Sequence, residues 1–411
     1  MELHSQYLVD MEIARLQSWW HRLLRWQHIG LCLLVLIPLI LHFIIVMQPG
    51  ELVLDEFYYV NDARDILDGQ GEIRYEHPPM GQAYIVSGVF LFGDNPIGWR
   101  FFSVIFGTIG IVLFYLICRK LDMPKDASLF ATFLLSLENL SFVKAGVAML
   151  DVYTFTFMLV AFLLYLNGRY LPSGVSVGLS ALAKLSGWLV LPVIFLHWLF
   201  SSRARPRCFL GLILSVPAAF VLLISLFDLI IWKQMYNPIE RIGLLLTQST
   251  AVTFADFTHP ASSRPWDWIL RPEMMWYWYD PHYIGAISFT VWALIIPAVI
   301  YMVFKAKEGN NAAIFGLSWF AGTYLVWIPM SLITDRLSYV YYFYPTVGAI
   351  CIGIGLGLSQ LLHAGNNKGS IKLRRATMLI VPGYLLLHVA VFVILSPVFA
   401  QWINVIPTPS P

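Results

Sequence analysis

An acidic pair, Asp55 and Glu56, is the most conspicuous chemical feature, because apolar and aromatic residues enclose it. The run LVL precedes the pair and the run FYY follows it. A carboxylate in such surroundings loses solvation, which raises its basicity, and at a membrane surface it is costly unless it is used or paired. The pair therefore predicts a catalytic or binding site. The alternative is a solvated acidic loop, which the other acids of this stretch favour.

Other chemically capable residues follow along the chain. His77 precedes two prolines, which fix an extended turn and present the imidazole from a rigid backbone; a plain structural turn is the alternative. Six further charges fall at predicted outer ends of apolar segments: Arg100, Glu138, Lys144, Asp151, Lys184 and Arg336. A charge at mid-membrane costs roughly 2.5–3.5 kcal/mol, so these residues are expected to be paired or to face a polar cavity. Snorkelling to the surface is the alternative for any single one. Together, cations beneath an acidic pair suit a phosphate and a nucleophile.

The elements that position these residues must lie in a membrane. Of 411 residues, 58% are apolar and 12% charged, whereas soluble chains are about 25% charged. This composition excludes soluble, disordered, fibrous and disulfide-rich secreted classes. We predict an all-α integral membrane protein with about eleven spans. They lie near 29–47, 97–118, 127–143, 150–167, 174–187, 187–200, 208–231, 283–304, 312–333, 338–361 and 376–398.

Charge placement predicts the orientation. With the N-terminus in the cytoplasm, the inside segments hold 16 of the 26 Lys and Arg residues but only 6 of the 24 acids, which follows the positive-inside rule. Residues 1–28 are predicted to form a cytoplasmic amphipathic segment, with no cleavable signal peptide. Two long connections, 48–96 and 232–282, and the tail 399–411 then lie outside. We expect one multi-span domain, 1–411, with short amphipathic helices in the outer loops that roof a site at the outer face.

Taken in order, several segments resemble motifs of the protein O-mannosyltransferases, which use polyprenyl-phosphate sugars and have a C-type glycosyltransferase fold. LDEFYY resembles the Asp-Glu motif, HPPMGQ the His-Pro-Pro motif, and GWRFFSVIFG the Arg-bearing entry to the second span. LENLSFVKAGVAMLD, GLSALAKLSGW, SSRPWDWI and DRLSYVYYFYP resemble later motifs, so the resemblance covers nearly the whole chain. Each motif alone is weak, whereas their shared order is more specific.

The chain departs from the family pattern at three places. Gln82 stands where the family usually has Lys, and Lys144 stands near a usual Arg. The loop 232–282 is too short for the β-trefoil domain that eukaryotic members insert. The resemblance is therefore to a compact prokaryotic member, and it implies a bacterial or archaeal plasma membrane rather than the endoplasmic reticulum. The departures leave the acceptor and the sugar open.

The resemblance implies transfer of a sugar, with mannose expected, from a polyprenyl phosphate to a protein Ser or Thr hydroxyl. Asp55 would be the general base of an inverting displacement and Glu56 would hold the acceptor. The donor phosphate would be bound by Lys184, Arg100, Arg336 and His77. Acceptor or sugar contacts are assigned to Glu56, Tyr58, Asp151, Glu138 and Lys144. We expect no cofactor and no metal, although Asp55 and Glu56 could hold a divalent ion.

The expected partners are a polyprenyl-phosphate sugar, a protein or peptide acceptor and the bilayer. No nucleic-acid partner is expected, and the oligomeric state stays open. One alternative is transfer of an aminosugar or pentose to lipid A or a glycan. The other is a transporter or flippase for lipid-linked sugars, but transporters favour charges at the midplane and paired repeats. Here the charges cluster at one face.

Overall fold

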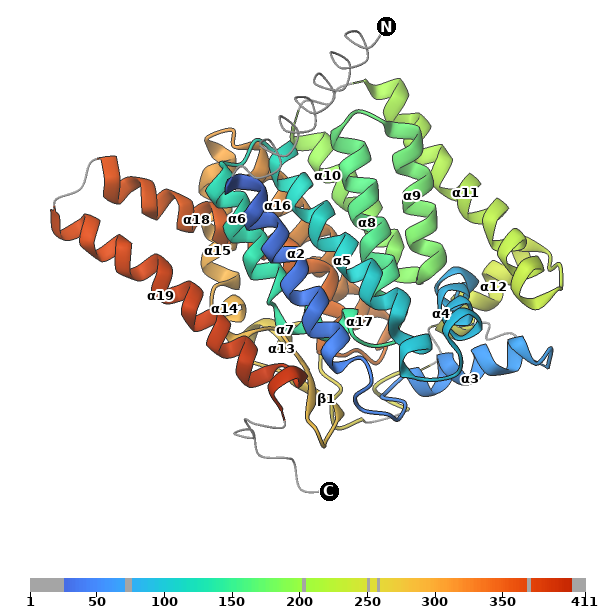
Figure 1. Cartoon of the computed structure of the whole chain (residues 1–411). Coiled ribbons are helices and arrows are strands. Elements are labelled where there is room, and N and C mark those ends of the chain that lie inside the picture. Colours follow the sequence, from blue (N-terminus) through green and yellow to red (C-terminus); the bar gives the residue numbers. More distant parts are fainter. Residues whose placement is uncertain are drawn as a thin grey trace, which may run out of the picture.

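The computed structural model describes residues 26–70, 76–201, 205–249, 252–256, 259–367 and 371–400. In this part of the chain, packed helices form the body and a two-stranded sheet lies at one end (Figure 1). The predicted amphipathic segment at 1–28 and the predicted tail at 399–411 lie almost wholly outside the described residues.

The first half of the chain supplies the central helices. In order they are α2 (Trp26–Ile45), α3 (Glu56–Leu67), α4 (Pro79–Phe92), α5 (Pro96–Lys120), α6 (Lys125–Ser136), α7 (Asn139–Ala145), α8 (Asp151–Leu166), α9 (Tyr170–Ala183), the 3-10 turn η1 (Leu185–Leu189), α10 (Val190–Phe200) and α11 (Pro206–Trp232). Local signals explain their ends. Before α5, the Asn95 side chain accepts hydrogen bonds from the first backbone N–H groups, and Pro96 opens the helix.

The second half begins with surface elements and returns to long helices. In order they are α12 (Pro238–Ser249), α13 (Asp267–Leu270), β1 (Met274–Trp278), β2 (Tyr283–Ala286), α14 (Phe289–Trp292), α15 (Ile295–Lys307), α16 (Asn311–Phe320), the π-helical turn η2 (Ala321–Leu325), α17 (Trp327–Thr334), the 3-10 turn η3 (Val340–Thr346), α18 (Val347–Asn367), α19 (Ile371–Leu395) and η4 (Pro397–Phe399). The strands β1 and β2 pair antiparallel.

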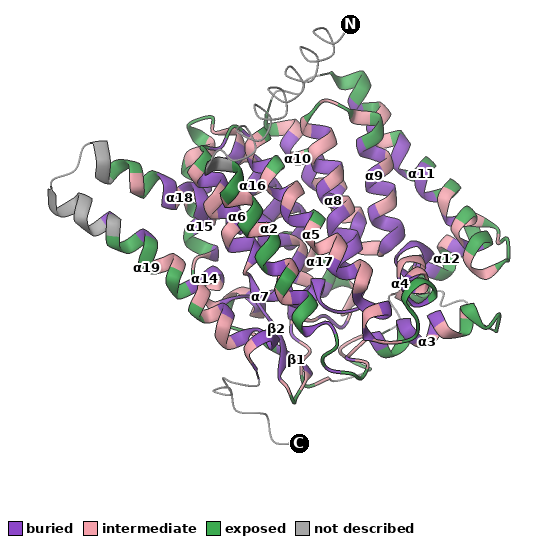
Figure 2. Cartoon of the chain, viewed as in Figure 1, coloured by how far each residue is buried: buried purple, intermediate pink, exposed green. Residues whose placement is uncertain are grey.

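The outer helices expose apolar side chains, as expected for a protein surrounded by lipid. Helix α8 is buried along most of its length, whereas α2, α11 and α19 carry exposed faces (Figure 2). Those faces are apolar: Ile40 is 56% exposed, Leu222 72% and Leu379 75%. A soluble protein would not present such faces to water. Apolar exterior helices around a buried centre are the arrangement that a bilayer requires.

The predicted count of eleven spans is not confirmed. Among the described residues, five helices are long and apolar enough to cross a membrane, or six if the pair α6 and α7, bent by 61°, forms one span. Several other predicted spans coincide with shorter apolar helices, α8, α9, η1 with α10, and the later part of α19. The chain is therefore a multi-pass membrane protein in which many segments are too short or too broken to meet a length criterion.

The two long predicted loops contain helices, as expected, and also a β-hairpin that was not predicted. Within 48–96, α3 and α4 form, and the apolar run after the His-Pro-Pro turn is a helix because Pro79 can open one. Within the Trp-rich part of 232–282, β1 replaces an expected interfacial helix. Its aromatic residues favour strands, and Met275 and Tyr277 alternate inward. The predicted span 283–304 likewise begins as β2 before α14 and α15.

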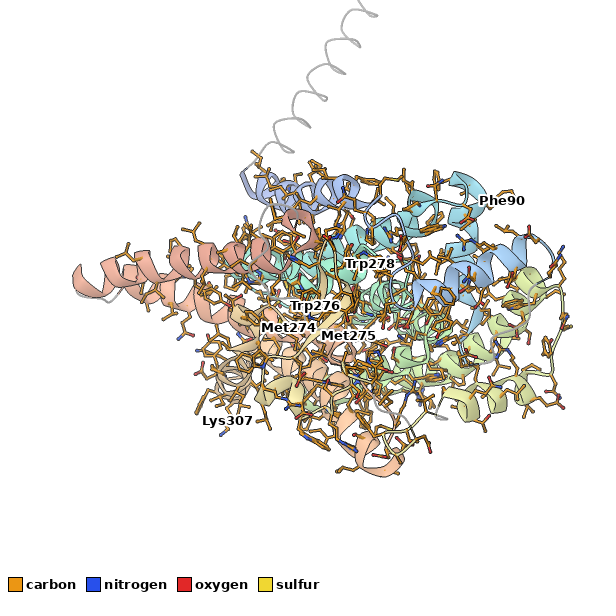
Figure 3. The ribbon with its side chains drawn as sticks, turned by 90° about the horizontal axis from the view of Figure 1, so that it is seen from below. Phe90, Met274, Met275, Trp276, Trp278 and Lys307 are labelled. Atoms are coloured by element: carbon orange, nitrogen blue, oxygen red, sulfur yellow. The ribbon has the colours of Figure 1, made fainter. Side chains whose placement is uncertain are left out.

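These loop elements gather at one end of the helical body. Helices α3, α4 and α12 and the β1–β2 hairpin occupy the lower half of Figure 1, at the end where α2 finishes and α5 starts. Seen from that end in Figure 3, the labelled β1 residues lie near the middle of the face. The site predicted at the outer face falls beneath this cover.

Candidate active site

The loop that carries Asp55 is organised by a buried ion pair between Glu56 and Arg100. Nε of Arg100 lies 2.9 Å from Glu56 Oε1, and Nη2 lies 2.8 Å from Oε2, which is a bidentate contact. Glu56 also accepts hydrogen bonds from the backbone N–H groups of Val53 and Ala148. Both side chains of the pair are at most 1% exposed.

The same guanidinium gathers the chain just after α2. It donates to the backbone carbonyls of Val46, Gln48, Pro49 and Glu51. Glu56 and Arg100 were predicted to contact the acceptor and the donor phosphate. In this structure their polar atoms bind each other and the backbone instead, so they hold the loop on which Asp55 sits.

Asp55 precedes the first residue of α3 and is partly exposed. Burial raises the pKa of its carboxyl group, and the opposing positive charges of Lys184 and Lys144 only partly offset this. A carboxylate that is partly desolvated but still reachable is a stronger base than one in water. This is the environment that the sequence predicts for Asp55.

Two lysines share one carboxylate close to Asp55. Asp151, at the start of α8, lies 3.2 Å from Lys144 Nζ through Oδ2 and 2.9 Å from Lys184 Nζ through Oδ1. The Lys144 side chain is fully buried, whereas that of Lys184 is 14% exposed. Lys184 follows the end of α9, where the helix stops and the backbone becomes extended. Asp55, Asp151, Lys144 and Lys184 thus form one charge cluster of two acids and two cations.

Aromatic rings from the late outer segments close over this cluster. The Lys144 ammonium lies 3.7 Å from the centroid of the Tyr341 ring and 5.5 Å from that of Tyr277. The Lys184 ammonium lies 5.5 Å from the Tyr341 ring. Cation–π contacts of this kind stabilise buried ammonium groups. Tyr341 and Tyr277 were not among the site residues predicted from the sequence.

A pocket opens beside the cluster and joins both outer loops. Its lining residues come from the two loops and the late aromatic segments: Glu76, His77, Asp151, Lys184, Leu185, Ser186, Ser249, Trp327, Arg336, Tyr342 and Pro345. Three of the four residues predicted to bind the donor phosphate, His77, Lys184 and Arg336, therefore meet in one cavity. The neighbouring acid, Asp335, forms an ion pair with Arg264, with 2.7 Å between Asp335 Oδ1 and Arg264 Nη2. Lys184 and Arg336 are the cations of this lining, and Glu76 and Asp151 are its acids.

The remaining predicted residues lie in different settings. His77 is hydrogen-bonded through Nε2 to the Tyr59 hydroxyl at 3.1 Å. Tyr58 is 49% exposed on α3, at the outer surface. Glu138 is fully buried and accepts hydrogen bonds from the N–H groups of Ser141 and Ser288, so it caps α7 and joins it to the segment before α14. Glu138 is therefore not at the pocket.

In the described part of the chain, no group of three or more His, Cys, Asp or Glu side chains is placed to hold a metal ion. Both oxygens of Glu56 already face the Arg100 guanidinium. What the site offers is a partly buried base, Asp55, near a pocket that Lys184 and Arg336 line, at one end of a membrane domain. Such a set suits transfer of a group from a phosphate.

The fold is that of membrane glycosyltransferases with the C-type architecture. The fold matches the structure of the Saccharomyces cerevisiae protein O-mannosyltransferase Pmt1-Pmt2 complex bound to the sugar donor, with a TM-score of 0.74, 11% identity and coverage of 91% of this chain and 90% of that one. It also matches ArnT from Cupriavidus metallidurans bound to undecaprenyl phosphate, with a TM-score of 0.57, 17% identity and coverage of 90% and 74%.

Sequence comparisons point to one family within this class. Residues 69–254 match the family described as dolichyl-phosphate-mannose-protein mannosyltransferase. The polyprenol-phosphate-mannose–protein mannosyltransferase of Mycobacterium tuberculosis is 25% identical, over 85% of this chain and 83% of that protein. Its namesake in Corynebacterium glutamicum is 23% identical, over 85% of each. The resemblance to protein O-mannosyltransferases is confirmed, and the chain is a glycosyltransferase related to them.

Proposed function

We propose that the chain transfers mannose from a polyprenyl-phosphate donor to a Ser or Thr hydroxyl of a protein at the outer membrane face. The observation that carries this proposal is the charge cluster at the edge of the pocket. It puts the Asp55 carboxylate near Lys184, which lines the pocket together with Arg336. The names of the mannosyltransferase relatives supply the sugar, the lipid and the acceptor class.

The donor phosphate is assigned to Lys184 and Arg336. As the bond from the sugar C1 to the phosphate oxygen breaks, negative charge grows on the leaving phosphate, and fixed cations lower the barrier to that change. Asp151 holds Lys184 in place at 2.9 Å, and Lys144 shares the same carboxylate. Lys144 and Asp151 are therefore assigned to positioning Lys184 rather than to the sugar.

The acceptor hydroxyl is assigned to a position next to the Asp55 carboxylate. That carboxylate takes the proton of the acceptor hydroxyl while the hydroxyl oxygen forms a bond to the sugar C1. Polyprenyl phosphate leaves from the opposite side, so the configuration at C1 inverts. Glu56 and Arg100 hold the loop, and Tyr58, exposed in the first turn of α3, is assigned to the acceptor chain.

An apolar groove offers a place for the polyprenyl tail. It runs between α10, α15 and α16, and Leu196, Phe200, Val303 and Leu317 are among the residues that line it. Leu325 lies in this groove and Trp327, two residues along the chain, lines the charged pocket. A lipid whose phosphate lies at Lys184 would thus pass Trp327 and enter an apolar groove within the membrane.

Three further assignments belong to the proposal. The reaction needs no metal, because the two oxygens of Glu56 are taken by Arg100. The N-terminus is cytoplasmic and the site is at the outer face of a bacterial or archaeal plasma membrane. The chain forms one multi-span domain.

The test is direct transfer. Purified protein in lipid nanodiscs is given labelled polyprenyl-phosphate mannose with a Ser/Thr-rich peptide, and labelled peptide is expected. An Ala-substituted peptide of the same length is the matched control. A second candidate is pentose or aminosugar transfer, because the chain is also 25% identical, over 72% of its length, to an undecaprenyl phosphate-α-4-amino-4-deoxy-L-arabinose arabinosyl transferase of Pseudomonas fluorescens. Transfer only to a glycolipid acceptor would favour that function instead.

A further inference from the structure

A buried ion pair outside the charge cluster ties the second outer loop to the His-Pro-Pro turn. Asp228 lies in the last turns of α11, and Arg241 lies in α12. Arg241 Nε is 3.1 Å from Asp228 Oδ2, and both side chains are 1% exposed. The same guanidinium donates from Nη2 to the backbone carbonyl of His77 at 3.2 Å. One arginine thus bridges a transmembrane helix, a surface helix and the turn that lines the pocket.

The contribution of a buried ion pair to the stability of the folded protein does not explain why this pair is present. Burial removes the solvation of both ions, and replacing a buried pair by apolar residues of similar size is often neutral or stabilising. A pair of this kind is better understood through the geometry that it fixes. Here the fixed element is the backbone at His77, whose side chain lines the donor pocket.

Helix α12 has few other attachments on its inner face. Its buried residues are Arg241 and Leu245, one turn apart, and Leu245 packs in a cluster that contains Met80 of α4. The outer face is apolar and open, with Ile239 80% and Leu246 56% exposed. Arg241 therefore supplies a buried polar contact between α12 and the turn.

The far end of α12 reaches the same pocket. Ser249, the last residue of the helix, is one of the residues that line it. Eight residues separate Arg241 from Ser249, which is about 12 Å of helix. An anchor at Arg241 therefore fixes two pocket residues at once: His77 through its carbonyl and Ser249 through the helix.

We propose that Asp228 and Arg241 are positioning residues that clamp α12 to the His-Pro-Pro turn and so hold His77 and Ser249 at the donor pocket. This inference rests on the proposed function in that the pocket is taken to receive the donor phosphate. Loss of the clamp weakens donor binding while the base, Asp55, and the cations stay in place. The donor KM rises and kcat changes little.

The test replaces the pair by apolar residues of similar size, Asp228→Leu with Arg241→Met, which leaves no charge unpaired. We expect a thermal midpoint near that of the wild type and a donor KM raised about tenfold. If the clamp acts through His77, adding these changes to His77→Ala raises the donor KM little further, because interacting sites are not additive. The control is Arg64→Gln with Asp94→Asn, which removes the partly exposed 2.9 Å ion pair away from the pocket; its donor KM stays at the wild-type value.

Hydrogen exchange supplies a readout that needs no substrate. The backbone amides of 76–82 and of α12 exchange faster in the apolar pair variant than in the wild type if the clamp holds them. Wild-type exchange there or a wild-type donor KM would each overturn the proposal, and full additivity with His77→Ala would overturn its action through His77. Should the wild type transfer no sugar at all, the proposed function fails, and the exchange data still decide the clamp. Arg241→Lys is the second variant if the apolar pair does not fold. It keeps the charge but replaces the planar guanidinium, which contacts Asp228 through Nε and the His77 carbonyl through Nη2, by a single ammonium group. Its donor KM is also expected to rise, and an unchanged value would overturn the clamp.

Discussion

Replacement of Glu56 distinguishes a loop-holding residue from an acceptor-binding one. In Glu56→Ala, the Arg100 guanidinium, 1% exposed, loses its ionic partner, and the N–H groups of Val53 and Ala148 lose their acceptor. Breaking a buried pair in this way costs roughly 3–5 kcal/mol. Since about 1 kcal/mol corresponds to roughly 2–4 °C in chains of 150–250 residues, and to less in longer ones, we expect a fall in thermal midpoint of about 5–15 °C.

The assay is thermal unfolding of the purified protein by a tryptophan or size-exclusion readout, with transfer measured below the transition. Glu56→Gln keeps an oxygen for one N–H donor but loses the charge, so its fall is expected to be smaller. Hydrogen bonds to charged groups contribute about 1.5–3 kcal/mol each. Asp65→Asn, on the same α3 helix, is the matched control and is expected to leave the midpoint unchanged. A Glu56→Ala protein with a wild-type midpoint and a raised acceptor KM would refute the reasoning and restore Glu56 as an acceptor contact.

Three further predictions concern the charge cluster. Asp55→Asn lowers the transfer rate by more than about 100-fold, because the general base is lost. Burial raises the pKa of Asp55, so its ionised carboxylate lowers the stability of the native protein at neutral pH, and the variant is expected to keep or raise the thermal midpoint. A lowered midpoint would contradict this. In the wild type, kcat/KM falls as pH is lowered, with an apparent pKa above the ordinary Asp value of about 3.9, because the base must be ionised; an acid limb at or below that value would contradict it. Lys184→Met lowers transfer roughly 100- to 1,000-fold yet folds, since Asp151 keeps Lys144 as a partner, and transfer within tenfold of the wild type would exclude Lys184 from phosphate binding.

The prediction of metal independence has its own check. Protein treated with EDTA and desalted keeps its transfer rate, because the cations that face the pocket are side chains of Lys184 and Arg336. The control is a parallel sample resupplied with Mg²⁺ or Mn²⁺, which transfers at the same rate. A rate lost with EDTA and restored by either ion would contradict the metal-free assignment.

Much of the fold class could be predicted from the local amino-acid composition. Charge scarcity, apolar runs and clusters of Lys and Arg predict a membrane protein, and the helical body confirms that class. The count of spans could not be predicted as well, because Gly, Pro and charges interrupt the middle segments. Helix α9, for example, ends before Lys184, and the chain continues as a 3-10 turn.

The composition of the site was easier to predict than its contacts. The apolar and aromatic setting of Asp55 indicated a desolvated carboxylate, and Lys184 and Arg336 stood out as charges at span ends. Pairings across long sequence separations carry no local signal: Glu56 and Arg100 are 44 residues apart. Asp228 in α11 likewise pairs with Arg241 in α12, a separate helix that follows it.

The β1–β2 hairpin shows a different limit. Aromatic residues at a membrane surface suit an interfacial helix and a strand equally well by composition. The strand forms because Met275 and Tyr277 bury one side while Gly285 on β2 lets the Tyr277 ring lie against it. A Cβ at Gly285 would lie 2.8 Å from that ring, which only the folded structure reveals.

The central claim is that Asp55 deprotonates a protein hydroxyl for attack on a polyprenyl-phosphate sugar held by Lys184. The most direct measurement is single-turnover transfer from labelled polyprenyl-phosphate mannose to a Ser/Thr-rich peptide by the wild type and by Asp55→Asn, with donor binding measured on the same samples. We expect labelled peptide from the wild type, and donor binding without transfer from the variant. Transfer by Asp55→Asn at a rate close to that of the wild type would contradict the account.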